Sequence, residues 1–150
     1  MGNLKIIKEL SKAYAMELET VQNYIATSVN LDGVRSDVIK KALAADVATE
    51  ISHAQLLANR IKTIGGIVPG SLDLPRAQKY LQPVKDTTDI VRAIKGVIAA
   101  EEDAIAQYNK IIKLCDGVDY VTQDMAIGIL SGEEDHRREF LGFLKEYQKK

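Results

Sequence analysis

The chain has 150 residues, of which 46% are hydrophobic and 27% charged, a composition typical of one globular domain over residues 1–150 rather than of a disordered chain. Its 20 basic and 21 acidic residues give a net charge of −1, which excludes a basic surface for nucleic acid and a polybasic membrane patch. No run approaches the roughly 18 apolar residues that a membrane span needs, and the N-terminus shows no export signal, so we expect a cytoplasmic protein.

Four long segments carry apolar residues at alternating spacings of three and four, the pattern of an amphipathic helix that packs against a core. The strict alternation of polar and apolar residues that is typical of strands is scarce. We therefore predict helices over about residues 3–31, 34–64, 87–115 and 118–148. Short turns at Asp32-Gly33 and Asp116-Gly117 join the helices into two antiparallel hairpins, and Gly128 and Gly142 predict close helix packing in the last segment.

The connection between the second and third segments, from Gly65 to about Asp86, is long for a compact domain. It can cross the full height of a bundle, which would place the second and third helices parallel to each other. Residues 75–82 are expected to form one or two turns of short helix within it. The predicted fold is all-α, an up-down-down-up four-helix bundle with one long crossover between helices two and three.

Each predicted helix carries a glutamate on its apolar stripe, near its middle, where a bundle should be driest. Burying an ionised carboxylate there costs several kcal/mol unless a partner compensates for it. Within each hairpin the two glutamates lie at similar distances from the turn, so we expect all four at one level of the bundle. These four residues are Glu17, Glu50, Glu101 and Glu133.

The only two histidines lie beside two of these glutamates. His53 follows Glu50 by three residues, and His136 follows Glu133 by three. Residues three apart project from one face of a helix, so each helix offers a carboxylate and an imidazole together. Exposed neighbours such as Glu102 are expected to be solvated, as is Glu19.

The chain also repeats itself, because both halves carry the same residues at nearly the same intervals. Tyr24 follows Glu17 by seven residues, and Tyr108 follows Glu101 by seven. The two glutamates of a hairpin are 33 residues apart in the first half and 32 in the second, as the residue numbers show. We therefore expect a site with approximate two-fold symmetry.

The charge of the four carboxylates indicates what the site binds. Two divalent cations neutralise a charge of about −4, and each imidazole adds one nitrogen ligand, a mixture that suits iron or manganese, with zinc also possible. The alternative is a metal-free buried polar network, to which Arg60 could contribute by pairing with one of the acids. One cation cannot satisfy four carboxylates at one level, so we favour the metal site.

Ferritin-like di-iron proteins bind their metals with one glutamate from each of two helices and one Glu-x-x-His motif from each of the other two. The chain resembles this ferritin-like di-iron carboxylate family, and most closely bacterioferritin and Dps-like proteins with a ferroxidase site inside the bundle. The motifs that carry the resemblance are MELETVQNYI (16–25), TEISHAQLL (49–57), AAEEDAIAQY (99–108) and GEEDH (132–136).

The resemblance implies two iron ions per chain and oxidation of Fe(II) to Fe(III) by O₂ or H₂O₂, for iron storage or detoxification. It also implies a homo-oligomer, from a dimer to a shell of 12 or 24 subunits. It assigns roles to eight residues: terminal ligands Glu17 and Glu101, bridging ligands Glu50 and Glu133, nitrogen donors His53 and His136, and Tyr24 and Tyr108 as groups that hydrogen-bond a ligand or donate an electron.

Two departures from the family, one neighbouring acid and two alternative functions accompany this resemblance. Ile51 stands where bacterioferritin has its haem-binding methionine, so we expect no haem. Asp46, one turn before Glu50, is expected to be a hydrogen-bonding partner or part of an access path rather than a ligand. Cys115 is the single cysteine, so no Cys-x-x-Cys pair can feed electrons to a rubrerythrin-like peroxide-reducing protein. A non-redox bundle that holds two zinc or manganese ions is the other alternative.

Overall fold

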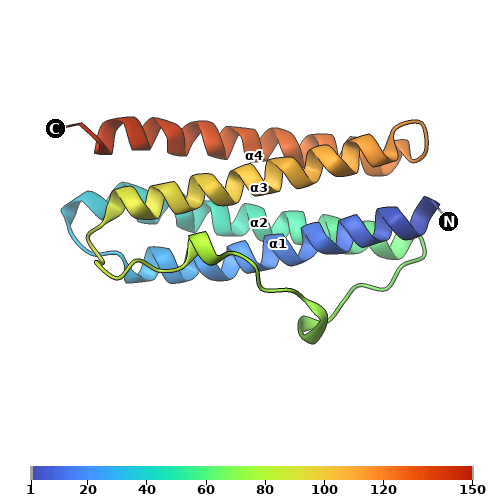
Figure 1. Ribbon diagram of the computed structural model, residues 1–150, viewed down its shortest axis with the longest axis horizontal. Helices are drawn as coiled ribbons and strands as arrows, with labels where there is room; N and C mark the ends of the chain where they lie inside the picture. The colour runs from blue at the N-terminus through green and yellow to red at the C-terminus, as the bar shows by residue number, and fades with distance from the viewer. Residues whose placement is uncertain (1, 150) are drawn as a thin grey trace.

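A computed structural model of the chain describes residues 2–149 and contains four long helices (Figure 1). Within the described residues there is no strand, and the predicted four-helix bundle is confirmed. The long helices are α1 (Gly2–Asn30), α2 (Asp37–Thr63), α3 (Ile90–Cys115) and α4 (Tyr120–Tyr147), and three short 3₁₀ turns are η1 (Val34–Ser36), η2 (Ser71–Asp73) and η3 (Lys79–Leu81).

The helices run in the predicted up-down-down-up order. In Figure 1, α1 and α2 form one hairpin and α3 and α4 the other, while the connection between α2 and α3 runs back along the length of the bundle. α2 and α3 are therefore parallel. The hairpin turns require glycine, because Gly33 and Gly117 have φ angles of 94° and 69°, which disfavour other residues.

Each helix of the second hairpin begins with an aspartate side chain that caps its N-terminus. The Asp89 carboxylate accepts a hydrogen bond from the backbone N–H of Arg92 at the start of α3. Asp119 accepts one from Thr122 at the start of α4. Each cap satisfies an amide that would otherwise lack a partner at the helix end. α3 accordingly begins at Ile90, three residues later than the sequence predicts.

The apolar core is divided into two clusters. Along every long helix, residues of the two clusters lie on opposite sides of the buried glutamate, so a polar layer separates them. One cluster comprises Tyr24, Leu31, Ile39, Leu43, Leu81, Ile90, Ala93, Ile94, Val97, Ile98, Ala100 and Phe140. The other comprises Ile6, Leu10, Ala13, Leu57, Ile61, Tyr108, Ile111, Cys115, Ala126 and Ile129.

The crossover is fixed to α1 by a buried carboxylate. Glu19 accepts hydrogen bonds of 3.0 Å from the backbone N–H groups of Ala77 and Gln78, so the expectation that Glu19 is solvated is wrong. The Gln78 side chain donates to Thr20 and accepts from Asn23 on the same helix. These bonds hold residues 77 and 78 against the middle of α1.

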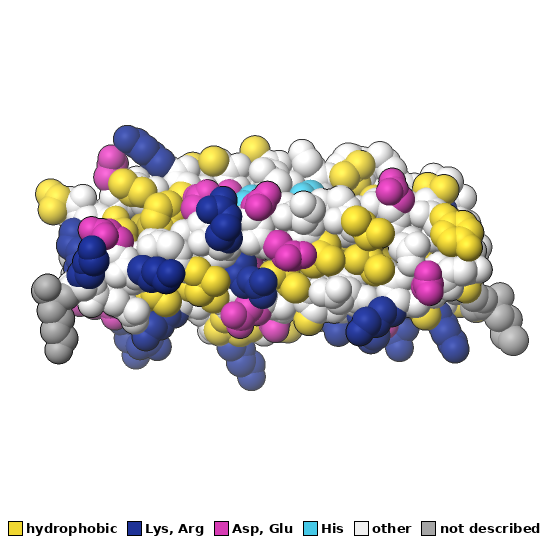
Figure 2. All heavy atoms as spheres, turned by 90° about the horizontal axis from the view of Figure 1, so that it is seen from above, with side chains coloured by type: hydrophobic (Ala, Val, Ile, Leu, Met, Phe, Trp, Pro, Cys, Tyr) yellow, Lys and Arg dark blue, Asp and Glu magenta, His cyan; other side chains and the backbone are white. Residues whose placement is uncertain are grey.

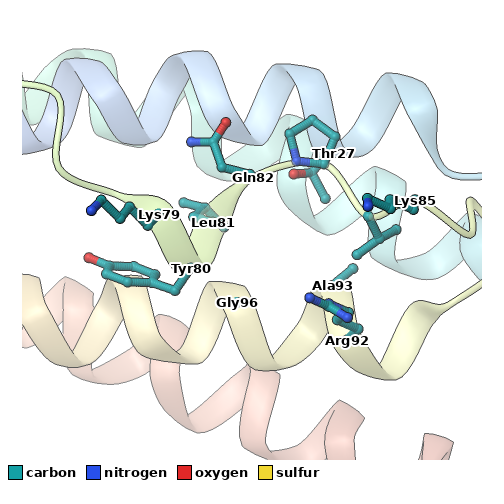
Figure 3. A pocket seen from close by; sticks show the side chains of 11 residues that line it. Thr27, Lys79, Tyr80, Leu81, Gln82, Lys85, Arg92, Ala93 and Gly96 are labelled. Carbon is teal, nitrogen blue, oxygen red and sulfur yellow. The ribbon is translucent and has the colours of Figure 1, made fainter.

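The crossover also contacts α3, at Gly96 (Figure 3). A Cβ at Gly96 would lie 2.8 Å from the carbonyl oxygen of Tyr80, so only glycine permits this approach. The expectation of close packing at Gly128 and Gly142 is wrong, since a Cβ at either would meet no atom within 4 Å among the described residues. The short helix expected at 75–82 is reduced to the single turn η3.

No helix in residues 2–149 combines the length and the apolar character needed to cross a membrane.

Candidate metal centre

The six residues singled out in the sequence converge at one level of the bundle. Each long helix brings one glutamate to this level, and none of the four glutamates is more than 2% exposed. The two histidines lie at the edge of the centre. In Figure 2, histidine atoms reach the surface only as small cyan areas near the middle of the bundle's long axis. We call these the six donor residues: Glu17, Glu50, His53, Glu101, Glu133 and His136.

The six donor residues form two overlapping groups. In each group one candidate ligand atom per residue lies within 4.8 Å of all the others. The first, which we call the His53 position, comprises Glu17, Glu50, His53 and Glu133. The second, the His136 position, comprises Glu50, Glu101, Glu133 and His136. Glu50 and Glu133 belong to both groups, as bridging ligands would, while Glu17 and Glu101 belong to one group each.

Both imidazoles turn the same nitrogen toward the carboxylates. Nδ1 of His53 lies 3.0 Å from Oε1 of Glu133 and 3.6 Å from Oε2 of Glu17. Nδ1 of His136 lies 3.5 Å from Oε1 of Glu50 and 3.8 Å from Oε1 of Glu101. Nδ1 of each histidine therefore faces the carboxylates of its own group.

One buried polar atom of each donor residue makes no hydrogen bond, and the 3.0 Å contact between His53 Nδ1 and Glu133 Oε1 joins two such atoms without forming one. Leaving such an atom unpaired costs about 1–3 kcal/mol, and more when the group is charged. Two divalent cations would supply the missing partners, so the donor set fits a dinuclear metal site. The unpaired atoms of the donor residues are Glu17 Oε2, Glu50 Oε1, His53 Nδ1, Glu101 Oε2, Glu133 Oε1 and His136 Nδ1. Thr27 Oγ1 and Asp46 Oδ2 are also buried without a hydrogen-bond partner.

Arg60 does not neutralise the centre. Its guanidinium donates to Asp119 Oδ1 at 2.8 Å and to Thr122 Oγ1 at 2.7 Å, at the start of α4. The pairing of Arg60 with one of the four buried glutamates, which the metal-free alternative allowed, is therefore wrong. No lysine or arginine forms an ion pair with the six donor residues within the described part of the chain.

Burial and mutual repulsion shift the protonation of the carboxyl groups. Burial, together with the neighbouring Glu133, raises the pKa of Glu101 to about 11. Burial raises the pKa of Glu133 to about 7. Burial also raises the pKa of Glu50, but the neighbouring Glu17 carboxyl and the two imidazoles lower it further, to below its ordinary value. The metal-free centre therefore holds protons at neutral pH, and cations that bind there must displace them.

The two tyrosines connect the hairpins across the centre. The Tyr24 hydroxyl on α1 donates to Glu101 Oε1 on α3 at 2.5 Å, and the Tyr108 hydroxyl on α3 donates to Glu17 Oε1 on α1 at 2.5 Å. Burial and the nearby carboxylates raise the pKa of both tyrosines, so the phenols remain protonated donors. The structure thus gives them the hydrogen-bonding contacts that the sequence predicted.

Two further polar residues, Asp46 and Gln78, lie at the edge of the centre. Asp46 is buried, and its Oδ1 lies 3.3 Å from Nε2 of His136, the partner position that the sequence allowed for it. Gln78, from the crossover, lines a cavity of about 10 Å³ together with Glu17, Glu50 and other residues of the centre. Gln78 cannot be predicted from the sequence, because a glutamine in a loop without periodicity gives no signal.

A larger hollow lies away from the donor residues. It has a volume of about 290 Å³ and lies between η3 and the first turns of α3, as Figure 3 shows. Lys79, Lys85 and Arg92 contribute to its lining, whereas none of the six donor residues does. This hollow is therefore separate from the carboxylate centre.

Comparison with known proteins identifies the family. The family model for a ferritin-like domain matches residues 7–149. This chain belongs to the ferritin-like family. It is 31% identical over 134 residues to the bacterioferritin of Desulfovibrio desulfuricans, an alignment that covers 88% of this chain and 70% of that protein.

Solved structures share the ferritin-like fold. The dodecameric thioferritin of Bacteroides fragilis, a bacterioferritin-related protein, matches with a TM-score of 0.88 and 26% identity, over 97% of this chain and 87% of that one. A ferritin-like, diiron-carboxylate protein of Bacillus anthracis matches with a TM-score of 0.83 and 20% identity, over 96% of this chain and 98% of that one. The predicted ferritin-like family and fold are confirmed.

Proposed function

We propose that this ferritin-like chain binds two Fe(II) ions at the six donor residues and oxidises them to Fe(III) with O₂ or H₂O₂, for iron storage or detoxification. The observation that carries the proposal is the unpaired buried atom on each donor residue, in two groups that share two glutamates. Bacterioferritin among the relatives and a diiron-carboxylate protein among the structural neighbours support iron as the metal.

The charges and electrons of the reaction balance. Four carboxylates neutralise two ferrous ions, and two imidazoles give each ion a nitrogen ligand. A pair of ferrous ions gives up two electrons, which reduce one H₂O₂ to two hydroxide ions, or one O₂ with two protons to H₂O₂. The protons displaced from the buried carboxyl groups when iron binds leave those groups ionised as ligands.

Residues of the chain itself would position the ligands of the two ions for this reaction. Glu50 and Glu133, which belong to both groups, would bridge the two ions, and Glu17 and Glu101 would be terminal ligands. The phenol of a tyrosine donates a hydrogen bond to each of the two proposed terminal carboxylates and so orients it. Preorganised ligands of this kind lower the cost of reorganisation during electron transfer.

The assembly and the absence of haem remain part of the proposal. The Bacteroides fragilis relative is described as dodecameric, and a homo-oligomer of this chain would give ferric product an enclosed place to collect. Ile51, which takes the place of a haem-binding methionine, is 51% exposed on α2 and has no side-chain atom able to ligate haem iron. We therefore expect iron, rather than haem, to be the bound metal species.

Anaerobic addition of Fe(II) to the apoprotein, followed by mixing with O₂ or H₂O₂, tests this function. We expect saturation at two ions per chain and rapid formation of ferric absorbance. Glu101→Ala should abolish paired binding, whereas Glu102→Ala, the exposed neighbour, should not.

The outcomes separate the alternatives. Paired binding without any absorbance change with either oxidant would favour a non-redox zinc or manganese bundle. Turnover with H₂O₂ alone, in a small oligomer that stops at two ions, would favour a rubrerythrin-like peroxide-reducing protein. Uptake of many more ions by a large particle would establish storage.

A further inference from the structure

The two halves of the metal centre differ at one buried residue. The residue four places before Glu50 is Asp46, and the residue four places before Glu133 is Ile129. Asp46 is 7% exposed and Ile129 is 3% exposed, so both side chains lie inside the bundle. Ile129 packs in the apolar cluster that contains Ile6, whereas Asp46 places a carboxylate beside the metal centre.

The additional carboxylate of Asp46 lies next to only one of the two histidines, His136. Oδ1 of Asp46 lies 3.3 Å from Nε2 of His136, while Nδ1 of the same ring faces the carboxylates. Nε2 of His53 has no hydrogen bond or ion pair within residues 2–149. Its outer edge faces α4 at Gly132, where a Cβ would lie 3.9 Å from Nε2. His136 therefore has a carboxylate oxygen beside its outer nitrogen, whereas Nε2 of His53 has no carboxylate oxygen within ion-pair distance among residues 2–149.

Apart from Asp46, the two metal positions have the same types of donor residue. Each position has three glutamates and one histidine nitrogen, and the two positions share Glu50 and Glu133. A carboxylate that accepts the outer N–H of a ligand histidine fixes the tautomer and the ring orientation and makes the ligand nitrogen more basic. Removal of such a partner commonly costs about 10–100-fold in metal affinity. Asp46 also adds a negative charge on the side of His136.

We propose that the two metal positions are inequivalent, and that the His136 position fills first because Asp46 acts as a positioning residue for His136. The His53 position fills second and releases its metal more readily. This inference rests on the proposed dinuclear function and adds an order of filling to it.

Anaerobic titration of the apoprotein with Co(II) tests the inference without any turnover. Calorimetry gives the affinity of each step, and visible absorption reports the ligand field of each bound ion. We expect two resolved steps in the wild-type chain. His136→Ala should remove the tighter step, and His53→Ala should remove the weaker one.

Substitutions at Asp46 separate positioning from a merely structural role. Asp46→Leu should weaken the first step by about 10–100-fold and leave the second unchanged, so that the two steps merge. Asp46→Asn keeps an acceptor oxygen for Nε2 and should restore most of the first step. Glu139→Gln, which removes an exposed charge near Asp46, is the matched control and should leave both steps as they are.

Each remaining outcome counts for or against one of the two proposals. Equal affinities in the wild-type chain, or an Asp46→Leu variant in which both steps or neither step weakens, would overturn the order of filling. A wild-type chain that binds no Co(II) would instead contradict the dinuclear site itself. If Asp46→Leu fails to fold, as circular dichroism would show, Asp46→Ser removes the same contact with a small polar side chain.

Discussion

The hydroxyl of Tyr24 on α1 donates a 2.5 Å hydrogen bond to Oε1 of Glu101 on α3. The two residues belong to different hairpins, and the reciprocal bond from Tyr108 to Glu17 makes the arrangement two-fold. Each half of the repeated sequence thus donates a hydrogen bond to a buried carboxylate of the other half. The centre consequently depends on the docking of the two hairpins, not on either hairpin alone.

Tyr24→Phe should slow Fe(II) oxidation about 10-fold or more while leaving two ions bound per chain, because Glu101 loses the donor that orients it. Stopped-flow absorbance after anaerobic loading measures this rate. Tyr14→Phe on the same helix, where the hydroxyl makes no hydrogen bond within the described residues, is the control. An unchanged rate for Tyr24→Phe would show that the phenol only packs.

Glu101→Gln should leave the metal-free chain at least as stable as the wild type while abolishing paired metal binding. Burial raises the pKa of Glu101 to about 11, so the wild-type side chain is already neutral without metal, and glutamine has the same shape. Thermal unfolding with and without Zn(II) measures both properties. At a free metal concentration 100 times Kd, the wild type should gain about 2.7 kcal/mol per site. A variant that gains as much as the wild type would contradict the ligand assignment.

The metal-free chain should lose stability as the pH rises from about 4.5 to about 9. Burial raises the pKa of Glu133 to about 7, and the neighbouring Glu50 carboxylate raises the pKa of His136 to about 9. A raised pKa means that the folded state binds more protons than the unfolded state, so that stability is present at low pH and is lost as the pH passes through the folded pKa.

Bound metal should reverse this dependence, because protons compete with cations for the same groups. Urea denaturation at a series of pH values, with and without Zn(II), measures both trends. A metal-free chain whose stability rises steadily over that range would contradict the protonation that we assign to the centre.

Gly96→Ala should destabilise the fold by about 1–3 kcal/mol, because its Cβ would lie 2.8 Å from the Tyr80 carbonyl oxygen and would push the crossover away. Gly128→Ala is the matched control, since its Cβ meets no atom within 4 Å in residues 2–149. It should stabilise helix α4 by up to about 1 kcal/mol. Chemical denaturation compares the two variants. Equal effects would show that the crossover does not press on α3 at Gly96.

Glu19→Gln should lower stability by about 1–3 kcal/mol, because a buried carboxylate that accepts two backbone N–H groups is replaced by a neutral amide. Glu102→Gln, at an exposed position on α3, should change stability little. Native-state hydrogen exchange of the Ala77 and Gln78 amides should increase in the Glu19 variant alone. Protection that persists there would show that other contacts hold the crossover.

The helices and the six donor residues could be predicted from the sequence, because apolar residues recur at helical spacing and the donor residues interrupt that pattern. A glutamate on an apolar stripe is an exception to a regular pattern, and Glu50-His53 and Glu133-His136 repeat that exception at one spacing. The contacts of the crossover could not be predicted, because Glu19 and Gln78 are 59 residues apart and follow no repeat. Gly96 and Gly128 also look alike in sequence, and only the path of the crossover distinguishes them.

The most direct test of the dinuclear site is the anomalous scattering of iron in crystals loaded anaerobically with Fe(II). We predict two iron peaks per chain, one within about 2.0–2.2 Å of ligand atoms at the His53 position and one at the His136 position, with Glu50 and Glu133 in contact with both. A single peak, peaks elsewhere in the bundle, or no peak at the six donor residues would contradict the account.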